Sequence, residues 1–213
     1  MNRRTLGRLL TATLSLALLA SAPFARAAAD EAPDALIKRV SSEVRDAIKS
    51  DKAIQAGESG RVLALVDAKV MPNVNFTRMT ASAVGRNWRQ ATPEQQKRLQ
   101  EEFKILLIRT YSGALAQVKD QSINVKPMRG ATPTDTEVVV RTEVVGNGDP
   151  VQLDYRMEKS PSGWKIYDLN VLGVWLVETY RTQFAQEINA KGVDGLIASL
   201  VQRNKTNVNA KKS

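Results

Sequence analysis

The chain has 213 residues, contains no cysteine and no histidine, and carries a formal net charge of +9. These absences exclude disulfides, a thiol nucleophile, an imidazole base and the common zinc ligand sets. A chain of this length can bury one sizeable core, and without disulfides its stability must come from packing.

The N-terminal segment has the pattern of a secretory signal peptide. Three arginines precede an apolar run at residues 9–20, and a small-x-small cleavage site follows at 25–27. A membrane anchor is the weaker alternative, because the run is shorter than the ~20 residues that span a bilayer. Removing residues 1–27 lowers the formal charge from +9 to +5. We therefore expect a freely diffusing exported protein, and export argues against a nucleic-acid partner.

Helices dominate the first half of the predicted structure. Pro33 suits the first turn of a helix whose apolar stripe runs to Ile48. Ser59 is a candidate cap for a second helix. Asn75 is a candidate cap for a third, which should end near Gly85. The run Thr92-Pro93-Glu94-Gln95 combines a capping box with a first-turn proline, so a long amphipathic helix should begin there.

The second half of the chain begins with a change to period-two hydrophobicity. Alternation starts at Ile123 and continues through 137–144, 151–158 and 164–171, with turn sequences between the last three runs. This pattern predicts a curved four-stranded antiparallel meander with one face in water and the other covered by helices. The predicted fold class is therefore α+β.

Two more helices are predicted after Gly173. The first should close at Lys191-Gly192, and Asp194 is a candidate cap for the last one. Residues 204–213 are polar and basic without periodicity, so we expect a disordered tail. The sequence shows no repeat or composition break that would divide the chain into two domains.

Candidates for catalysis are few. No nucleophile elbow, P-loop or dinucleotide-binding motif is present, and we expect no enzyme activity and no metal or other cofactor. Asp168 is the one carboxylate worth weighing as a general acid or base, because its apolar strand neighbours Trp164 and Ile166 should raise its pKa. The commoner role of such an aspartate is to bind a backbone amide or an arginine.

Residues in both halves of the chain resemble the MlaC family, also called the toluene-tolerance auxiliary proteins. The matching residues of the first half are Phe76, Arg78, Met79, Gly85, Trp88, Phe103, Leu107 and Tyr111. Those of the second half are Tyr155, Gly163, Trp164, Lys165, Ile166, Tyr167, Asp168, Gly173, Val174, Leu176, Val177, Tyr180, Arg181 and Phe184. Trp175 departs from the family pattern, where serine is commoner, and we expect it to affect the pocket mouth.

The resemblance implies a periplasmic phospholipid carrier of Gram-negative bacteria. Such a protein looks like a nuclear-transport-factor-like cone with an internal hydrophobic cavity, here formed by a single lipid-binding domain at residues 28–203. The family shuttles lipid between an outer-membrane lipoprotein–porin complex and an inner-membrane ABC transporter with its periplasmic substrate-binding subunit, which maintains outer-membrane lipid asymmetry. Contact with the membrane would be transient.

The candidate lipid-binding residues share an apolar or aromatic side chain, as a dry site for acyl chains requires. They are Phe76, Met79, Trp88, Phe103, Leu106, Leu107, Tyr111, Leu115, Val140, Val144, Leu153, Tyr155, Met157, Trp164, Ile166, Val174, Val177 and Tyr180. Arg78, Arg109 and Arg181 are candidates for the phosphate head group or a partner, and each is equally suited to be a solvated charge or part of an ion pair.

Two other functions remain open on the sequence. One is an enzyme of the same fold class that acts on a hydrophobic molecule through Asp168 or a tyrosine. The other is a lipid-free interaction module, for which a collapsed interior is expected. Periodicity alone cannot separate these from a carrier, because it indicates which residues are buried but not what lies opposite them.

Overall fold

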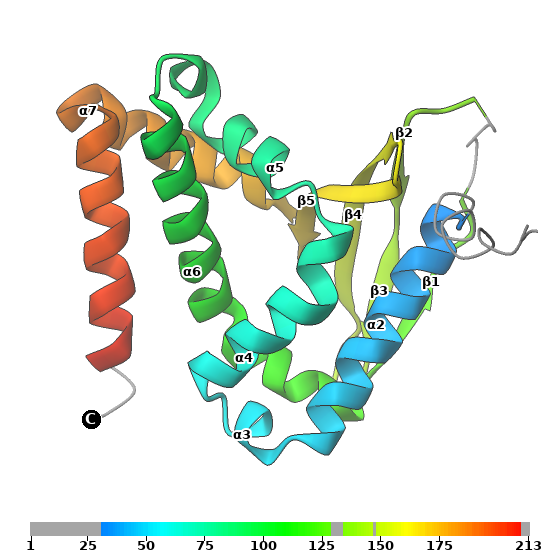
Figure 1. The fold of residues 1–213 in the computed structure, drawn as a ribbon. Helices are drawn as coiled ribbons and strands as arrows, with labels where there is room; N and C mark the ends of the chain where they lie inside the picture. Colours follow the sequence, from blue (N-terminus) through cyan, green and yellow to red (C-terminus); the bar gives the residue numbers. More distant parts are fainter. Residues whose placement is uncertain (1–30, 129–133, 147, 210–213) are drawn as a thin grey trace, which may run out of the picture.

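The computed structural model describes residues 31–128, 134–146 and 148–209, and the predicted signal peptide lies outside them. The described helices are α2 (Pro33–Ser50), α3 (Lys52–Gln55), α4 (Ser59–Leu65), the π-helix η1 (Val66–Val70), α5 (Phe76–Val84), α6 (Pro93–Gln117), α7 (Leu176–Asn209) and the 3₁₀-helices η2 (Met71–Asn73), η3 (Gly85–Arg89) and η4 (Val118–Asp120). They pack around one antiparallel sheet (Figure 1), which confirms the α+β class. The nuclear-transport-factor-like cone stays a prediction.

The sheet is a meander built around one long central strand. Its strands are β1 (Ser122–Val125), β2 (Glu137–Val140), β3 (Thr142–Val145), β4 (Val151–Ser160), β5 (Gly163–Val171) and β6 (Val174–Trp175). The order is β1-β3-β4-β5-β6, and β2 also pairs with β4. Every pairing between these strands is antiparallel, as the alternating pattern predicted.

The predicted strand count of four is wrong, because the described residues form a six-stranded sheet. The run 137–144 was expected to be one strand, but it divides at Arg141 into β2 and β3. At the division the amide of Thr142 donates to a side-chain oxygen of the neighbouring strand, Oδ1 of Asp154 on β4 (3.1 Å), instead of to a backbone carbonyl. The alternation of buried and exposed residues continues across the break, so the hydrophobic pattern gave no sign of it. The sixth strand, β6, is only two residues long.

One core forms between α5, α6 and α7 at the end of the molecule away from β1. Asn75 caps α5 by accepting a hydrogen bond from the amide of Arg78, and the predicted capping box at Thr92 and Gln95 begins α6. Phe103 of α6 is fully buried. Its ring lies 4.9 Å from that of Tyr180 and 5.1 Å from that of Phe184, both with near-perpendicular planes. This core is closed by aromatic packing.

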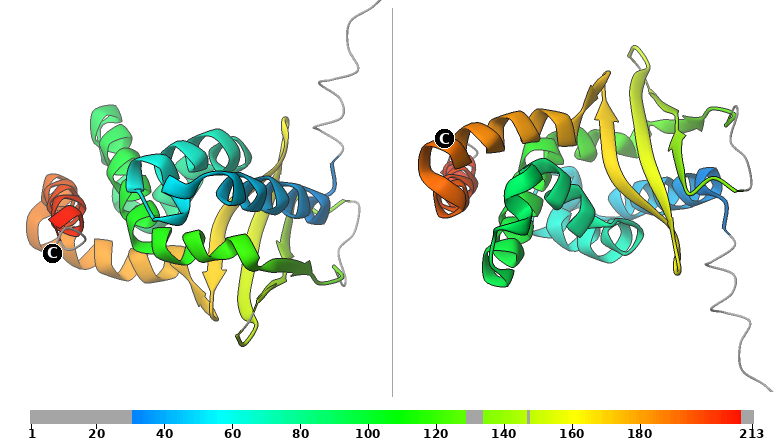
Figure 2. Two further views of the ribbon diagram at one scale, coloured as in Figure 1. Left: turned by 90° about the horizontal axis from the view of Figure 1, so that it is seen from below. Right: turned by 90° about the horizontal axis from the view of Figure 1, so that it is seen from above.

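A second core lies between α2 and the sheet. The apolar stripe of α2, which includes Leu36, Ile37 and Ile48, is buried, and it clusters with residues of β2, β4 and β5. Figure 2 shows α2 crossing in front of the strands, with α6 and α7 extending away at the other end. Helices therefore form two separate cores in this protein. Only the core between α5, α6 and α7 is filled by aromatic rings.

The C-terminal segment corrects a prediction. The break at Gly192 is confirmed, since this residue adopts φ 71° inside α7. Of the tail predicted to be disordered, residues 204–209 are helical, and residues 210–213 lie outside the described part of the chain. Asn204 is buried, and its Nδ2 donates to the carbonyl (3.0 Å) and to Oε2 (2.7 Å) of Glu102. This long-range contact is not visible in the local composition of the tail.

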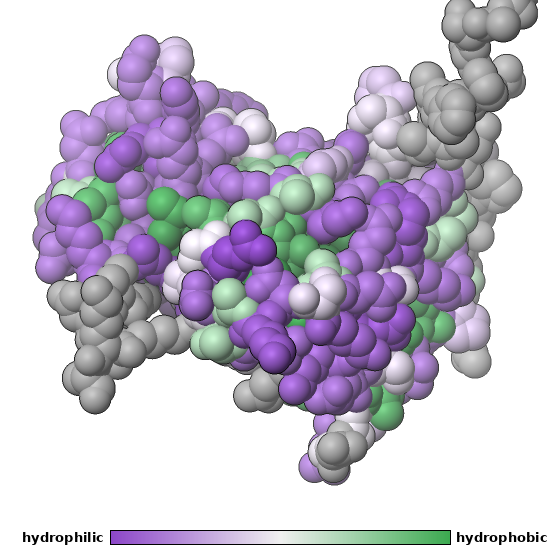
Figure 3. Space-filling model, turned by 60° about the horizontal axis from the view of Figure 1, so that its bottom comes forward, coloured by the Kyte–Doolittle hydropathy of each residue, from purple (hydrophilic) through white to green (hydrophobic). Residues whose placement is uncertain are grey.

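The outer surface is largely hydrophilic, with a narrow hydrophobic band between two hydrophilic surfaces on the side drawn in Figure 3. Among the described residues, the exposed large hydrophobic side chains are Val139, Leu172 and Val174. Within the same part of the chain, every helix is too short or too polar to cross a bilayer.

The capping box of α6 gives a first prediction. Replacing Thr92 with alanine removes the acceptor of the Gln95 amide and should lower the free energy of unfolding by about 1 kcal/mol. Urea denaturation of Thr92→Ala measures this loss. Thr182→Ala is the matched control, because Thr182 is exposed on α7 and its change should stay within about 0.5 kcal/mol. Equal stability of the two variants would contradict a role for the box.

Candidate binding cavity

An apolar cavity of about 220 Å³ lies between α2 and the concave arrangement of strands behind it. It is lined by Ile37, Val40, Ser41, Val44, Val70, Val74, Met79, Leu115, Val118, Ile123, Val144, Leu153, Tyr155, Ile166 and Leu169. These residues come from α2, η1, α5, α6, η4 and four strands, so the space is enclosed by most of the fold.

The lining follows from the helical and strand periods. Ile37, Val40 and Val44 recur at helical spacing on α2 and present one apolar face. Leu153 and Tyr155 are two residues apart on β4 and therefore project to the same side of the sheet. The interior is thus walled by aliphatic groups on both sides, which favours an apolar occupant over water.

The polar groups of this lining are the hydroxyls of Ser41 and Tyr155. Burial raises the pKa of the Tyr155 phenol, and the nearby hydroxyls of Ser41 and Thr142 oppose that rise. Tyr155 is therefore neutral at ordinary pH. The lining residues named above carry no side chain that is ionised at neutral pH.

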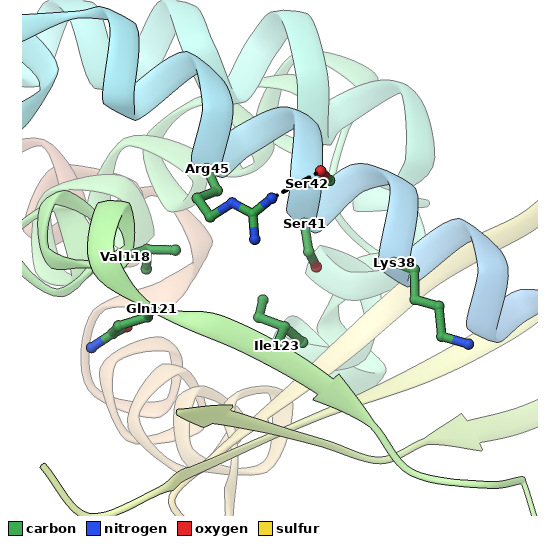
Figure 4. A pocket seen from close by; sticks show the side chains of 7 residues that line it. All are labelled: Lys38, Ser41, Ser42, Arg45, Val118, Gln121 and Ile123. Atoms are coloured by element: carbon green, nitrogen blue, oxygen red, sulfur yellow. Dashed lines mark hydrogen bonds between the residues drawn. The ribbon is translucent and has the colours of Figure 1, made fainter. Parts of the chain in front are cut away.

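A smaller polar cavity of about 110 Å³ adjoins the apolar one (Figure 4). The two cavities share Ser41, Val118 and Ile123. The other lining residues of the polar cavity are Lys38, Ser42, Arg45 and Gln121. The apolar interior therefore meets a polar, basic opening between α2 and the segment that joins α6 to β1.

The structure brings six of the predicted lipid-binding residues together in the apolar cavity: Met79, Leu115, Val144, Leu153, Tyr155 and Ile166. Three more do not line the cavity but belong to, or pack against, the same hydrophobic cluster as its lining, namely Val140, Met157 and Trp164. Whether any of them contacts lipid stays a prediction.

The other nine predicted residues do not line the cavity. Five of them fill the aromatic core of α5, α6 and α7: Phe76, Phe103, Leu106, Val177 and Tyr180. Trp88, Leu107 and Tyr111 pack against that core, and Val174 is exposed on β6. On α6, Leu115 lines the cavity, whereas Phe103 and Leu106 are buried in the core that α6 forms with α5 and α7.

The sequence reasoning missed the contribution of α2 and of the η1–η2 segment. Val40 and Val44 were identified as parts of an amphipathic stripe, as was Ile37, but the stripe was taken to be ordinary core. Val70 and Val74 had no recognised pattern. The available signal was the amphipathicity of α2 itself, which shows a buried face and cannot show that the space opposite is incompletely filled.

Arg78, predicted to contact a head group, instead joins α5 to β2, β4 and β5 of the sheet. Its Nη2 lies 2.7 Å from Oε1 of Glu137, its Nη1 pairs with Glu158, and its guanidinium stacks 3.6 Å from the ring centroid of Tyr167. The guanidinium holds the pKa of Glu137 below its usual range. Arg78 is therefore a structural cross-link.

The other two predicted arginines also lie outside both cavities. Arg109 is on α6, and its buried Nη1 has no hydrogen-bond partner among the described residues. Arg181 is exposed on α7, beside Gly85. Neither belongs to the lining of the polar opening.

Asp168 is held in the way that its commoner role predicts. It is buried, and its Oδ1 accepts hydrogen bonds from the amides of Leu169 (2.8 Å) and Val177 (3.0 Å). Its Oδ2 lies 3.0 Å from Nη1 of Arg156. Burial raises the pKa of Asp168 against these opposing contacts, in the predicted direction. Oδ1 therefore joins β5 to α7, Oδ2 is held by Arg156 of β4, and Asp168 lines neither cavity.

Trp175 does not lie at either cavity, contrary to the expected effect on the pocket mouth. Arg156 stacks over its ring at 3.9 Å from the centroid. Arg156 therefore contacts both Trp175 and Asp168 near the point where β5 and α7 meet.

The sequence and the structure are similar to those of known proteins. The family model described as MlaC protein matches residues 38–202. The solved structure of a phospholipid-binding protein from Ralstonia solanacearum, in complex with a phospholipid, is 50% identical, covers 82% of this chain and 98% of its own, and superposes with a TM-score of 0.79.

Two relatives of known sequence are more distant. The toluene tolerance protein ttg2D of Pseudomonas putida is 28% identical over 84% of this chain and 83% of its own. The intermembrane phospholipid transport system binding protein MlaC of Haemophilus influenzae is 22% identical over 83% of this chain and 84% of its own.

The cross-link made by Arg78 gives a second prediction. Arg78→Gln should lower the free energy of unfolding at pH 7 by about 1–2 kcal/mol, because both carboxylates lose their partner. The lowered pKa of Glu137 means that this stabilisation is present above pH 4.5 and is lost as the pH falls through the folded-state value. The variant should therefore lose less stability than the wild type on acidification.

Denaturation at a series of pH values measures this difference. Arg181→Gln is the matched control, since Arg181 is exposed and outside the cluster. A pH dependence of Arg78→Gln identical to that of the wild type would contradict the proposed cross-link.

Proposed function

The chain belongs to the MlaC family, and we propose that it is a periplasmic phospholipid carrier that holds acyl chains in the cavity between α2 and the sheet. The observation that carries this proposal is the apolar cavity of about 220 Å³ that opens beside a polar, basic rim. An apolar interior next to a polar opening matches the two ends of a phospholipid. A fully collapsed interior, as expected for a lipid-free module, is not what the fold contains.

The energetics of lipid transfer explain why such a cavity is needed. A diacyl lipid has roughly 30 methylenes, and at about 0.8 kcal/mol each their exposure to water costs on the order of 20 kcal/mol or more. A carrier must return most of this free energy through apolar walls. The aliphatic lining contributed by Ile37, Val40 and Leu153 is suited to this.

The size of the cavity sets a condition on the proposal. An apolar cavity of about 150 Å³ accommodates one benzene molecule, so 220 Å³ holds only a part of one acyl chain. Loading must therefore widen the cavity. Polar contacts fix α2 on the η1–η2 side, where Arg39 reaches Asn73 (3.3 Å) and Lys69 lies 3.4 Å from Glu43. Where α2 faces the strands, the lining is apolar apart from the neighbouring hydroxyls of Ser41 and Tyr155, so we expect the widening on that side.

The proposal includes the route that the family membership suggests. The protein would exchange lipid with an outer-membrane lipoprotein–porin complex and with an inner-membrane ABC transporter through its periplasmic substrate-binding subunit. The sequence contains no phosphate-binding loop, so any energy from ATP would be supplied by the transporter. Ralstonia and Haemophilus relatives named for phospholipid binding and transport support this assignment.

Lipid extraction tests the proposal directly. The protein purified from the periplasm under mild conditions should carry phospholipid at a defined ratio, because the occupied cavity is far more stable than separated lipid in water. Mass spectrometry of the organic extract identifies the lipid and phosphorus analysis gives its amount. Consistent recovery of protein without phospholipid would count against a carrier.

Filling the cavity gives a sharper test. Val144→Phe places a larger side chain in the lining on β3 and should reduce bound phospholipid by at least about half, while the free energy of unfolding is unchanged or slightly higher. Leu107→Phe is the matched control, because Leu107 packs on the aromatic core outside the cavity. Full occupancy in Val144→Phe would show that the acyl chains lie elsewhere.

A further inference from the structure

One face of α2 carries a polar stripe beside its apolar one. Lys38, Ser41, Ser42 and Arg45 follow one another at spacings of three, one and three residues, so they lie along one side of the helix. All four line the polar cavity, with Val118, Gln121 and Ile123 opposite them (Figure 4). Two cations and two hydroxyl groups therefore line this cavity, and Figure 4 shows the guanidinium of Arg45 over the space while the Lys38 side chain is directed away from Arg45 at its rim.

The guanidinium of Arg45 is the central group of this stripe. Its Nη2 donates to Oγ of Ser42 at 3.3 Å and its Nε lies 3.4 Å from Oδ1 of Asp46, both at the long end for such contacts. Its Nη1 donates to none of the described residues, and Figure 4 shows the group reaching over the space between Ser41 and Val118. Arg45 thus retains donors that point to the opening.

Three other arginines of the described chain, Arg39, Arg78 and Arg156, are engaged more closely. Arg78 is paired with two carboxylates, and Arg156 lies 3.0 Å from Asp168 and 3.2 Å from Glu178. Arg39 binds Glu31 through two nitrogens at 2.9 Å each. Arg45 differs from them because its contacts are longer and it lies beside a cavity.

On the side of the polar cavity that faces α2, a glycine leaves space for the side chain of Gln121. Gln121 packs against Gly146, where a Cβ atom would lie 2.9 Å from Cγ of the glutamine, so a residue with a side chain there would displace Gln121. The amide of Gln121 can donate or accept hydrogen bonds at the opening. Deeper inside, Ser41 lies on the boundary between the two cavities, and the hydroxyl of Tyr155 is near it.

We propose that the polar cavity binds the phosphate diester of the lipid at Arg45, with Ser41 and Ser42 donating hydrogen bonds and Lys38 adding positive charge at the rim, while the acyl chains enter the adjoining apolar cavity. The inference rests on the proposed function, since the tails fix where the phosphate lies. A phosphate group is smaller than benzene, which needs about 150 Å³, so it suits the 110 Å³ opening. Charge-assisted hydrogen bonds from a guanidinium are favoured for such oxygens.

The neighbouring acids limit the strength of this site. Asp34 lies 3.5 Å from Nζ of Lys38 and Asp46 lies 3.4 Å from Nε of Arg45. Each cation therefore has a weak, solvent-exposed partner that a phosphate would have to compete with. The site should favour a phosphate-bearing lipid over a neutral lipid of the same chains, and it should release that lipid readily, as exchange between partners requires.

A competition between lipids with and without phosphate tests the inference. Delipidated protein is incubated with vesicles that contain equal amounts of phosphatidylglycerol and diacylglycerol with the same acyl chains, and the bound lipids are quantified by mass spectrometry. The wild type should take up phosphatidylglycerol about tenfold in excess. The variant K38Q/R45Q should bring the ratio close to one while total bound lipid is retained.

Matched controls separate charge from position. The variant R89Q/K97Q removes the same charges from η3 and α6, away from both cavities, and should keep the wild-type ratio. Raising the salt concentration should lower the wild-type preference, since the opening is solvent-exposed, and should have little effect on K38Q/R45Q. Titration with inorganic phosphate alone distinguishes a lipid head group from a free ion.

The outcomes are distinct. A wild-type ratio in K38Q/R45Q, with lipid still bound, would overturn the phosphate site and leave the carrier function standing. Failure of the wild type to take up either lipid would overturn the carrier function itself. Tight binding of inorganic phosphate that is lost in K38Q/R45Q, with an unchanged lipid ratio, would assign the site to a free anion and overturn the head-group inference.

Discussion

The structure depends on the division of its apolar interior into two cores, one filled by aromatic side chains and one that contains a cavity. The rings of Phe103, Tyr180 and Phe184 close the core between α5, α6 and α7. Because this core packs densely by itself, the second core between α2 and the sheet can remain incompletely filled without unfolding the protein. A cavity removes dispersion contacts from its lining and costs stability, and the aromatic core, which does not share that space, can offset this cost.

Polar contacts hold the two cores in a fixed relation. Arg78 joins α5 to β2 and β4, and Asp168 joins β5 to the first turn of α7 through the amide of Val177. Both sites lie outside the cavity lining. The groups that fix the architecture are therefore different from the groups that face the cavity, and a bound molecule can come and go without breaking them. This division also explains why the conspicuous charged residues of the sequence are structural.

Local signals in the sequence predicted most of the elements. The capping box at Thr92, the cap at Asn75 and the break at Gly192 all occur where they were expected, because each depends on residues close together in the chain. The division of β2 from β3 at Thr142 and the helix beyond Asn204 were missed, because each depends on a contact with a distant residue, Asp154 or Glu102.

The candidate site was predictable only in part, for the same reason. Alternation on β4 identified Leu153 and Tyr155 as inward-facing, and they do line the cavity. The face of α6 around Phe103 looked equally suitable, but α7 covers it. The polar stripe of α2 was not predicted to be part of a site, because four polar residues on one side of a helix are typical of a solvent-exposed face. Only the structure shows that Gln121, and Ile123 of β1, lie opposite them.

The course of α7 has a practical consequence. After the turn at Gly192 the helix runs back along α6, and its last described residues lie at the opposite end of the molecule from β1 and α2 (Figures 1 and 2). A tether attached at that end would hold the protein on a surface with the cavity opening facing outward. Attachment at the end of α7 would therefore leave the cavity opening accessible, so that lipid exchange could be measured on single immobilised molecules.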